Sequence, residues 1–155
     1  VEIQRKNTTK ALDYFNQAAN LFTDNTKKAN VYYRIATMYS KSNKVQSRAY
    51  ARKAIQVKPS YGKAYLLIAS LYGSSINECG STQFEKRAVY WLAAQYCDKA
   101  AAADSTLKGK ASGDAARYRA AAPSKTEIFQ ENKAGQRIAF NCWIGESVVV
   151  PNIGK

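Results

Sequence analysis

The clearest pattern along the chain is an eight-residue arrangement of aromatic and small apolar positions that occurs twice. Residues 32–39 begin and end with tyrosine and carry Ile-Ala between them, and residues 65–72 repeat this plan. In each copy the first, fourth, fifth and eighth positions fall on one face of a helix with 3.6 residues per turn. We therefore predict two helices whose alanines let a neighbouring helix approach closely, with a tyrosine on either side of each contact.

Further helices are predicted on both sides of this repeated pattern. Thr82 and Glu85 have the spacing of a capping box, which indicates the start of a long helix after an irregular loop around Cys79. Pro59 is expected to end the helix that precedes it. Apolar residues at intervals of three and four predict helices at residues 9–22, 27–41, 45–57, 61–72, 82–103 and 105–121.

The pattern changes after Pro123. Ser124 and Glu127 form a second capping box, which is sufficient for a short helix. Residues 137–144 then alternate apolar and polar side chains, and Gly145-Glu146 has the composition of a two-residue hairpin turn. We therefore predict an all-α array over residues 1–122, followed over residues 123–155 by an extension with a short helix and a β-hairpin.

The composition argues against catalysis. The chain has no histidine, which removes the commonest general base and the commonest metal ligand. No nucleophile elbow and no glycine-rich phosphate loop appears in the sequence. We predict that the protein is not an enzyme and has no cofactor and no metal site. No apolar run approaches the ~20 residues that a membrane-spanning helix needs.

The three cysteines lack the paired spacing of a zinc site. Cys97 falls on the packing face of the long helix, where we expect a buried thiol. Cys79 lies in a loop and Cys142 in a predicted strand. They could form a disulfide in an oxidising compartment, or both could remain reduced.

The charge is strongly positive and unevenly placed. Lysine and arginine number 24 against 11 acidic residues, and no acidic residue lies between Asp24 and Glu78. A field of one sign favours anionic partners, although such a run can also be a solvated surface. Within this interval, like charges recur at helical spacings and are expected to repel one another. These residues form what we call the basic ridge: Lys41, Lys44, Arg48 and Arg52.

The paired helical pattern resembles the tetratricopeptide repeat, a two-helix unit of about 34 residues. First-helix positions are matched by Tyr32, Ile35, Ala36 and Tyr39, and again by Tyr65, Ile68, Ala69 and Tyr72. Second-helix positions are matched by Ser47, Ala51, Ala54 and Pro59, and by Ala93, Cys97, Ala100 and Ser105. The resemblance implies a right-handed superhelix of helix pairs, in which the last unit carries an insertion and the first unit is represented only by its second helix.

The chain also resembles bacterial tetratricopeptide proteins of the cell envelope, through residues 60–65, 84–91 and 141–146. This resemblance implies a periplasmic or cell-envelope location. Because residues 9–22 lack the helix that would complete their repeat, their apolar face is expected to be partly uncovered and to favour self-association.

In tetratricopeptide arrays the first helices line a concave groove, and the resemblance implies that a partner segment binds there. The residues expected in this groove are Asn30, Tyr33, Arg34, Thr37, Lys41, Lys63, Leu66 and Ser70. Our leading hypothesis is a non-catalytic protein-interaction scaffold with an acidic protein or peptide as partner. The rival hypothesis is a module that binds a polyanion, either nucleic acid or an acidic glycan, along the basic ridge. As a partner, nucleic acid is less favoured than protein.

Overall fold

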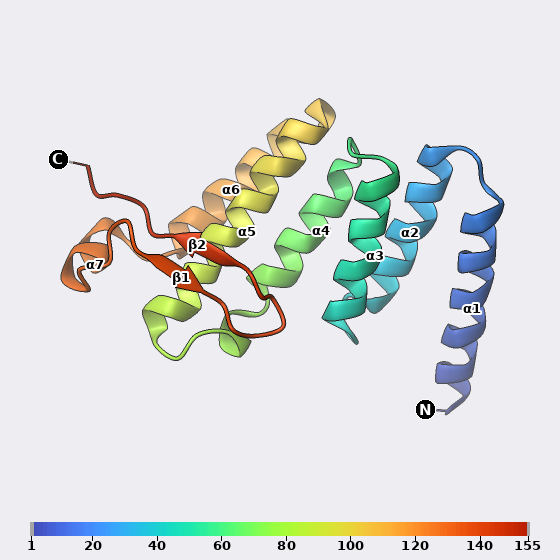
Figure 1. Cartoon of the computed structure of the whole chain (residues 1–155), viewed down its shortest axis with the longest axis horizontal. Helices are drawn as coiled ribbons and strands as arrows, with labels where there is room; N and C mark the ends of the chain where they lie inside the picture. Colours follow the sequence, from blue (N-terminus) through green and yellow to red (C-terminus); the bar gives the residue numbers. More distant parts are fainter. Residues whose placement is uncertain (1, 155) are drawn as a thin grey trace.

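The computed structural model describes residues 2–154, so the two chain ends included in the predicted domains lie outside it. Helices make up most of the chain, and a two-stranded antiparallel sheet lies near its end (Figure 1). The elements are α1 (Glu2–Leu21), α2 (Asn25–Tyr39), α3 (Lys44–Val57), α4 (Gly62–Gly73), the 3-10 helix η1 (Ile76–Glu78), α5 (Gln83–Ala103), the 3-10 helix η2 (Ser105–Leu107), α6 (Lys108–Ala121), α7 (Lys125–Gln130), β1 (Arg137–Ala139) and β2 (Ser147–Val149).

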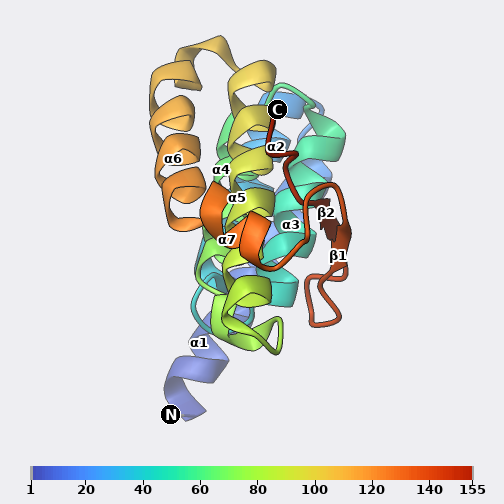
Figure 2. The ribbon, with the colours of Figure 1, turned by 90° about the vertical axis from the view of Figure 1, so that its left-hand side faces the viewer.

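Consecutive helices from α1 to α6 pack side by side (Figure 1). The molecule is therefore elongated, with α1 at one end and α7 and the hairpin at the other. Figure 2 shows α6 and the β1–β2 hairpin on opposite sides of α5. Over residues 2–154, no helix is both long enough and apolar enough to cross a membrane.

The two copies of the repeated pattern lie in α2 and α4, as predicted. Ala36 and Ala69 are both buried. The Ser47 hydroxyl of α3 donates a hydrogen bond to the carbonyl oxygen of Ala36 at 2.7 Å, so α3 crosses α2 closely at this alanine. A larger side chain at position 36 would force the two helices apart.

Side chains cap most of the helix starts. The Asp24 carboxylate accepts hydrogen bonds from the backbone N–H groups of Thr26 and Lys27, so α2 begins earlier than predicted. Both predicted capping boxes are formed, at the starts of α5 and α7. Helix α1 also begins earlier than predicted, because no glycine or proline interrupts residues 2–8.

The predicted two-residue hairpin turn at Gly145-Glu146 is wrong. Strands β1 and β2 pair with Ala139 opposite Ser147, and residues 140–146 form a longer loop between them. The Phe140 N–H donates to the Glu146 carbonyl oxygen at 2.9 Å, which leaves residues 141–145 as the tip. A tight turn is not possible here because the tip residues bind distant parts of the chain, as described below.

One hydrophobic core continues from the helices into the C-terminal extension. Ile128, Phe140, Ile144 and Val148 are buried in the same cluster as the alanines of α2, α3 and α4. The predicted boundary after residue 122 therefore does not separate two cores. An isolated hairpin is marginally stable, and the apolar packing on the helices stabilises this one.

Helix α1 packs mainly against α2 at the end of the array. The side chains of Leu12, Phe15 and Phe22 are half-buried, whereas Tyr14 and Leu21 are exposed. Apolar surface is therefore present on this helix, and self-association through it stays a prediction.

Candidate partner-binding groove

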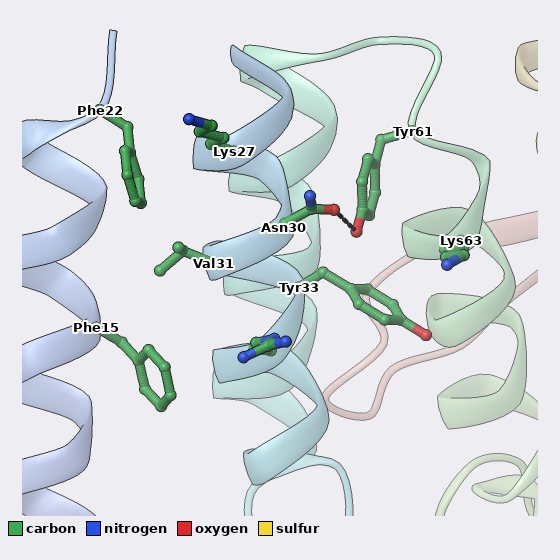
Figure 3. A pocket seen from close by; sticks show the side chains of 9 residues that line it. Phe15, Phe22, Lys27, Asn30, Val31, Tyr33, Tyr61 and Lys63 are labelled. Carbon is green, nitrogen blue, oxygen red and sulfur yellow. Dashed lines mark hydrogen bonds between the residues drawn. The ribbon is translucent and has the colours of Figure 1, made fainter. Parts of the chain in front are cut away.

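Two adjoining hollows form a groove along one side of the helices. The first hollow, about 500 Å³, lies between α1 and α2 and reaches the start of α4 (Figure 3). Its apolar walls are Phe15, Phe22 and Val31, and its polar lining includes Lys27, Asn30 and Arg34.

The second hollow, about 530 Å³, continues from α4 to α6. Tyr33 and Lys63 line both hollows, so they stand where the two meet. The second hollow has an apolar lining of Leu66, Leu67, Leu107 and Tyr118, and its charged lining is Lys110, Asp114 and Arg117.

A pair of tyrosines holds the junction of the hollows in place. The rings of Tyr33 and Tyr61 are 5.6 Å apart between centroids, and the Tyr61 hydroxyl donates to Asn30 Oδ1 at 2.7 Å (Figure 3). Burial raises the pKa of both tyrosine hydroxyls above the ordinary value. Both hydroxyls therefore stay protonated at neutral pH and remain hydrogen-bond donors.

The two hollows differ in how their charges are paired. Asp114 forms ion pairs with both Lys110 and Arg117, with 3.2 Å between Lys110 Nζ and Asp114 Oδ2. Burial acts to raise the pKa of Asp114, but hydrogen bonds from Arg117 and Lys110 outweigh it and lower the pKa.

No such pairing occurs in the first hollow. Lys27, Arg34 and Lys63 form no ion pair with any acidic residue in the part of the chain that the structure describes. Three unpaired cations therefore share one hollow with two phenylalanine rings.

Most of the residues expected in the groove lie there. Thr37 and Lys41 line neither hollow, and partner binding by these residues stays a prediction. Thr37 is exposed and its hydroxyl donates to the Arg34 carbonyl oxygen, while α2 ends before Lys41. The groove is lined by the other six: Asn30, Tyr33, Arg34, Lys63, Leu66 and Ser70.

The sequence reasoning missed the two outer walls of the groove. Phe15 comes from α1, which the resemblance assigned only to packing, and Phe22 directly follows this helix. Lys110 and Asp114 come from α6, which lines the groove together with α1, α2 and α4. Their opposite charges at a four-residue spacing indicate that both side chains lie on one face of a helix.

Much of the basic ridge makes contacts within the chain, and polyanion binding along it stays a hypothesis. The Arg48 guanidinium donates to the carbonyl oxygens of Ile144 at 2.6 Å and Trp143 at 2.9 Å. It also lies 4.8 Å from the centroid of the Trp143 ring. Arg48 is therefore covered by the hairpin loop.

Two further cations of the ridge are paired with acids. Arg52 lies 3.6 Å from a carboxylate oxygen of Glu146, and Lys44 lies 2.6 Å from one of Glu78. The expected repulsion is offset by acids that lie outside the acid-free interval of the sequence. Only Lys41 remains exposed without such a contact among the described residues.

Glu146 is the centre of the hairpin contact. The Tyr96 hydroxyl donates to it at 2.9 Å, and the Tyr72 hydroxyl donates to the same carboxylate. Burial, followed by these hydrogen bonds, raises the pKa of both tyrosines. Glu146 therefore joins α4 and α5 to the loop, and through Arg52 it also joins α3.

A disulfide between Cys79 and Cys142 completes the attachment of the loop, with 5.4 Å between the Cα atoms. Of the two alternatives left open by the sequence, the structure has the bonded one. Cys97 is a buried free thiol, as predicted. Burial raises its pKa to about 11, so the thiol stays protonated and unreactive at neutral pH.

Comparison with known proteins gives no family: no family model, no curated protein and no solved structure matches this chain. The function is therefore inferred from the groove and from the contrast between its cations and those beneath the hairpin.

Proposed function

We propose that the chain is a tetratricopeptide-like helical array that acts as a non-catalytic protein-interaction module. In this proposal an acidic segment of a partner protein lies in the groove formed by α1, α2, α4 and α6. The absence of histidine, the commonest general base, supports a binding role over a catalytic one.

The observation that carries the proposal is the unpaired charge of the first hollow. Two arginines elsewhere in the array are used internally: Arg48 binds carbonyl oxygens and Arg87 pairs with Glu127. Lys27, Arg34 and Lys63 have no such use and lie together in a concave surface. Complementary charge steers an acidic partner to such a surface and fixes its position.

The tetratricopeptide-like assignment is supported by the buried alanines at the helix crossings and by the alternate helices α2, α4 and α6, which all line the groove. The disulfide supports an oxidising compartment, since such bonds persist where the surroundings are not reducing. We propose the bacterial periplasm or cell envelope as that compartment.

Peptide display against two matched variants tests the proposal. Ser70→Trp places a bulky ring in the second hollow, and Gln56→Trp places the same ring at an exposed position of α3 outside both hollows. Peptides selected on the wild-type protein should be enriched in acidic residues, bind Gln56→Trp equally well and bind Ser70→Trp weakly.

Salt provides the second measurement. Affinity of the selected peptides should fall as ionic strength rises, because salt screens exposed charges. Peptides that carry no acidic enrichment, or that bind both tryptophan variants alike, would contradict the proposal.

A further inference from the structure

We propose that the groove binds its ligand in two chemically different parts, with carboxylates in the first hollow and an apolar side chain in the second. The ligand backbone crosses Tyr33, which lines both hollows. This inference rests on the proposed function and names the kind of segment that the groove selects: an acidic run next to a bulky apolar residue.

The first hollow is suited to glutamate side chains. Its lining contains Lys27, Arg34 and Lys63 and no acidic residue. Phe22 lies on the opposite wall, with Lys27 Nζ 5.9 Å from its ring centroid. A glutamate can therefore place its methylene groups against the phenylalanine while its carboxylate meets a lysine or arginine.

Asn30 adds hydrogen-bond donors to the same hollow. Its Oδ1 atom accepts the hydroxyl of Tyr61, which fixes the orientation of the amide. The amide NH2 group then remains available to a ligand that carries acceptors, and a carboxylate carries only acceptors. Figure 3 shows Asn30 between Lys27 and Tyr33 on the groove side of α2.

The second hollow is unsuited to a carboxylate. Asp114 already neutralises Lys110 and Arg117, and its side chain is only 17% exposed. An incoming carboxylate would meet this fixed negative charge above an apolar surface formed by Leu66, Leu67 and Leu107. An uncharged apolar side chain gains burial there without displacing either ion pair.

The probes are synthetic peptides with a glutamate block and a leucine block joined by glycine, made in both orders along the chain. One control peptide replaces the glutamates with glutamine, and another replaces the leucines with serine. Affinities are measured by fluorescence anisotropy at low and at physiological salt. One of the two block orders should bind best, and both substitutions should weaken it.

Asn30→Asp tests the first hollow with almost no change in shape. The new carboxylate still accepts the Tyr61 hydroxyl, but it loses the amide donors and adds negative charge. The glutamate peptide should bind about tenfold more weakly, while the glutamine peptide is unchanged. Asn77→Asp, at an exposed position of η1 outside both hollows, is the matched control and should change neither.

Asp114→Asn tests the second hollow by a gain of binding. Removing this charge frees Lys110 and Arg117, so a peptide with glutamate in both blocks should bind at least about threefold more tightly than it binds the wild type. Leu66→Gln should weaken the leucine peptide and leave the serine peptide unchanged. Thermal unfolding by circular dichroism confirms that each variant is folded.

Two outcomes overturn the inference while the proposed function survives. In one, Asn30→Asp weakens the glutamate and glutamine peptides equally. In the other, Asp114→Asn does not improve binding of the all-glutamate peptide although displayed peptides still depend on the groove. If no peptide of any composition depends on the groove in the display experiment, the proposed function itself fails.

Discussion

The groove and the hairpin-covered face contain the same kinds of residue and use them differently. Both place arginine or lysine next to tyrosine. Beneath the hairpin, Arg48 donates to two carbonyl oxygens and Glu146 accepts two tyrosine hydroxyls. In the groove, Arg34 and Lys63 form no ion pair with an acid among residues 2–154.

This difference separates cations that stabilise the fold from cations that are available to a ligand. A buried carbonyl or carboxylate that loses its cation costs stability, so the hairpin contacts are structural. Exposed, unpaired like charges contribute nothing favourable to folding. The predictions below test that separation from its largest consequence to its smallest.

Removing the disulfide should have the largest effect. The bond joins residues separated by 63 positions, and a loop of this length corresponds to about 4 kcal/mol of unfolding free energy. We expect the Cys79→Ala, Cys142→Ala double variant to lose about this much in chemical denaturation. Hydrogen exchange should accelerate in residues 137–150 and stay slow in α2. Equal loosening of both regions would show that the hairpin is not a separate attachment.

Arg48 and Arg34 give a direct comparison of one residue type on the two faces. Arg48→Met leaves the carbonyl oxygens of Trp143 and Ile144 without their hydrogen-bond donors. It should lower the free energy of unfolding by about 3 kcal/mol. Arg34→Met removes an exposed side chain without an acidic partner and should change stability by less than about 0.5 kcal/mol. Urea denaturation of both variants measures these changes. Similar losses of unfolding free energy would show that the two arginines do not differ in their contribution to the fold.

Local sequence signals predicted the helices well because the chemistry is local. The capping boxes at Thr82 and Ser124, the tyrosine–alanine pattern of α2 and α4 and the stop near Pro59 each depend on neighbours within a few residues. The structure confirms these elements with shifts of a few residues at their ends. Helix α1 is the exception, because a pattern without a breaker does not mark where a helix begins.

The role of the cations could not be predicted because their partners are distant in the sequence. Arg48 meets Trp143 across nearly the whole chain, and Arg52 meets Glu146. The acid-free interval suggested mutual repulsion, but folding brings acids to it from outside. The same contacts explain the failed hairpin turn, since residues 141–146 bind Cys79, Arg48 and the two tyrosines, Tyr72 and Tyr96.

A smaller effect is expected at acidic pH from Glu127. Hydrogen bonds from the Ser124 N–H and from Arg87 lower its pKa from 4.5 to about 2. Because the folded pKa lies below the unfolded one, the contribution is complete above about pH 4.5 and is lost as the pH falls towards 2.

Glu127→Gln should therefore flatten the dependence of stability on pH in that window. Between pH 7 and 8 the slope of this dependence should be the same in the variant and the wild type. Thermal melts at a series of pH values measure this. The groove variant Arg34→Gln is the matched control, since Arg34 forms no ion pair with an acid among residues 2–154. An identical acid response in wild type and Glu127→Gln would remove Glu127 as a contributor.

The smallest effect on stability is expected in the groove itself. Lys27→Gln with Lys63→Gln removes two unpaired charges from one hollow, which lowers repulsion in the free protein. Stability should stay within a few tenths of a kcal/mol of the wild type or rise slightly, since exposed charges are worth little.

The same double variant should nevertheless lose most of its affinity for the glutamate–leucine peptide, and the remaining binding should depend less on salt. Urea denaturation and anisotropy titrations on one protein preparation compare the two quantities directly. A loss of stability above about 1 kcal/mol would show that these lysines support the fold, as Arg48 does. In that case the cations of the groove would stabilise the fold as those beneath the hairpin do. The two faces would then differ only in exposure.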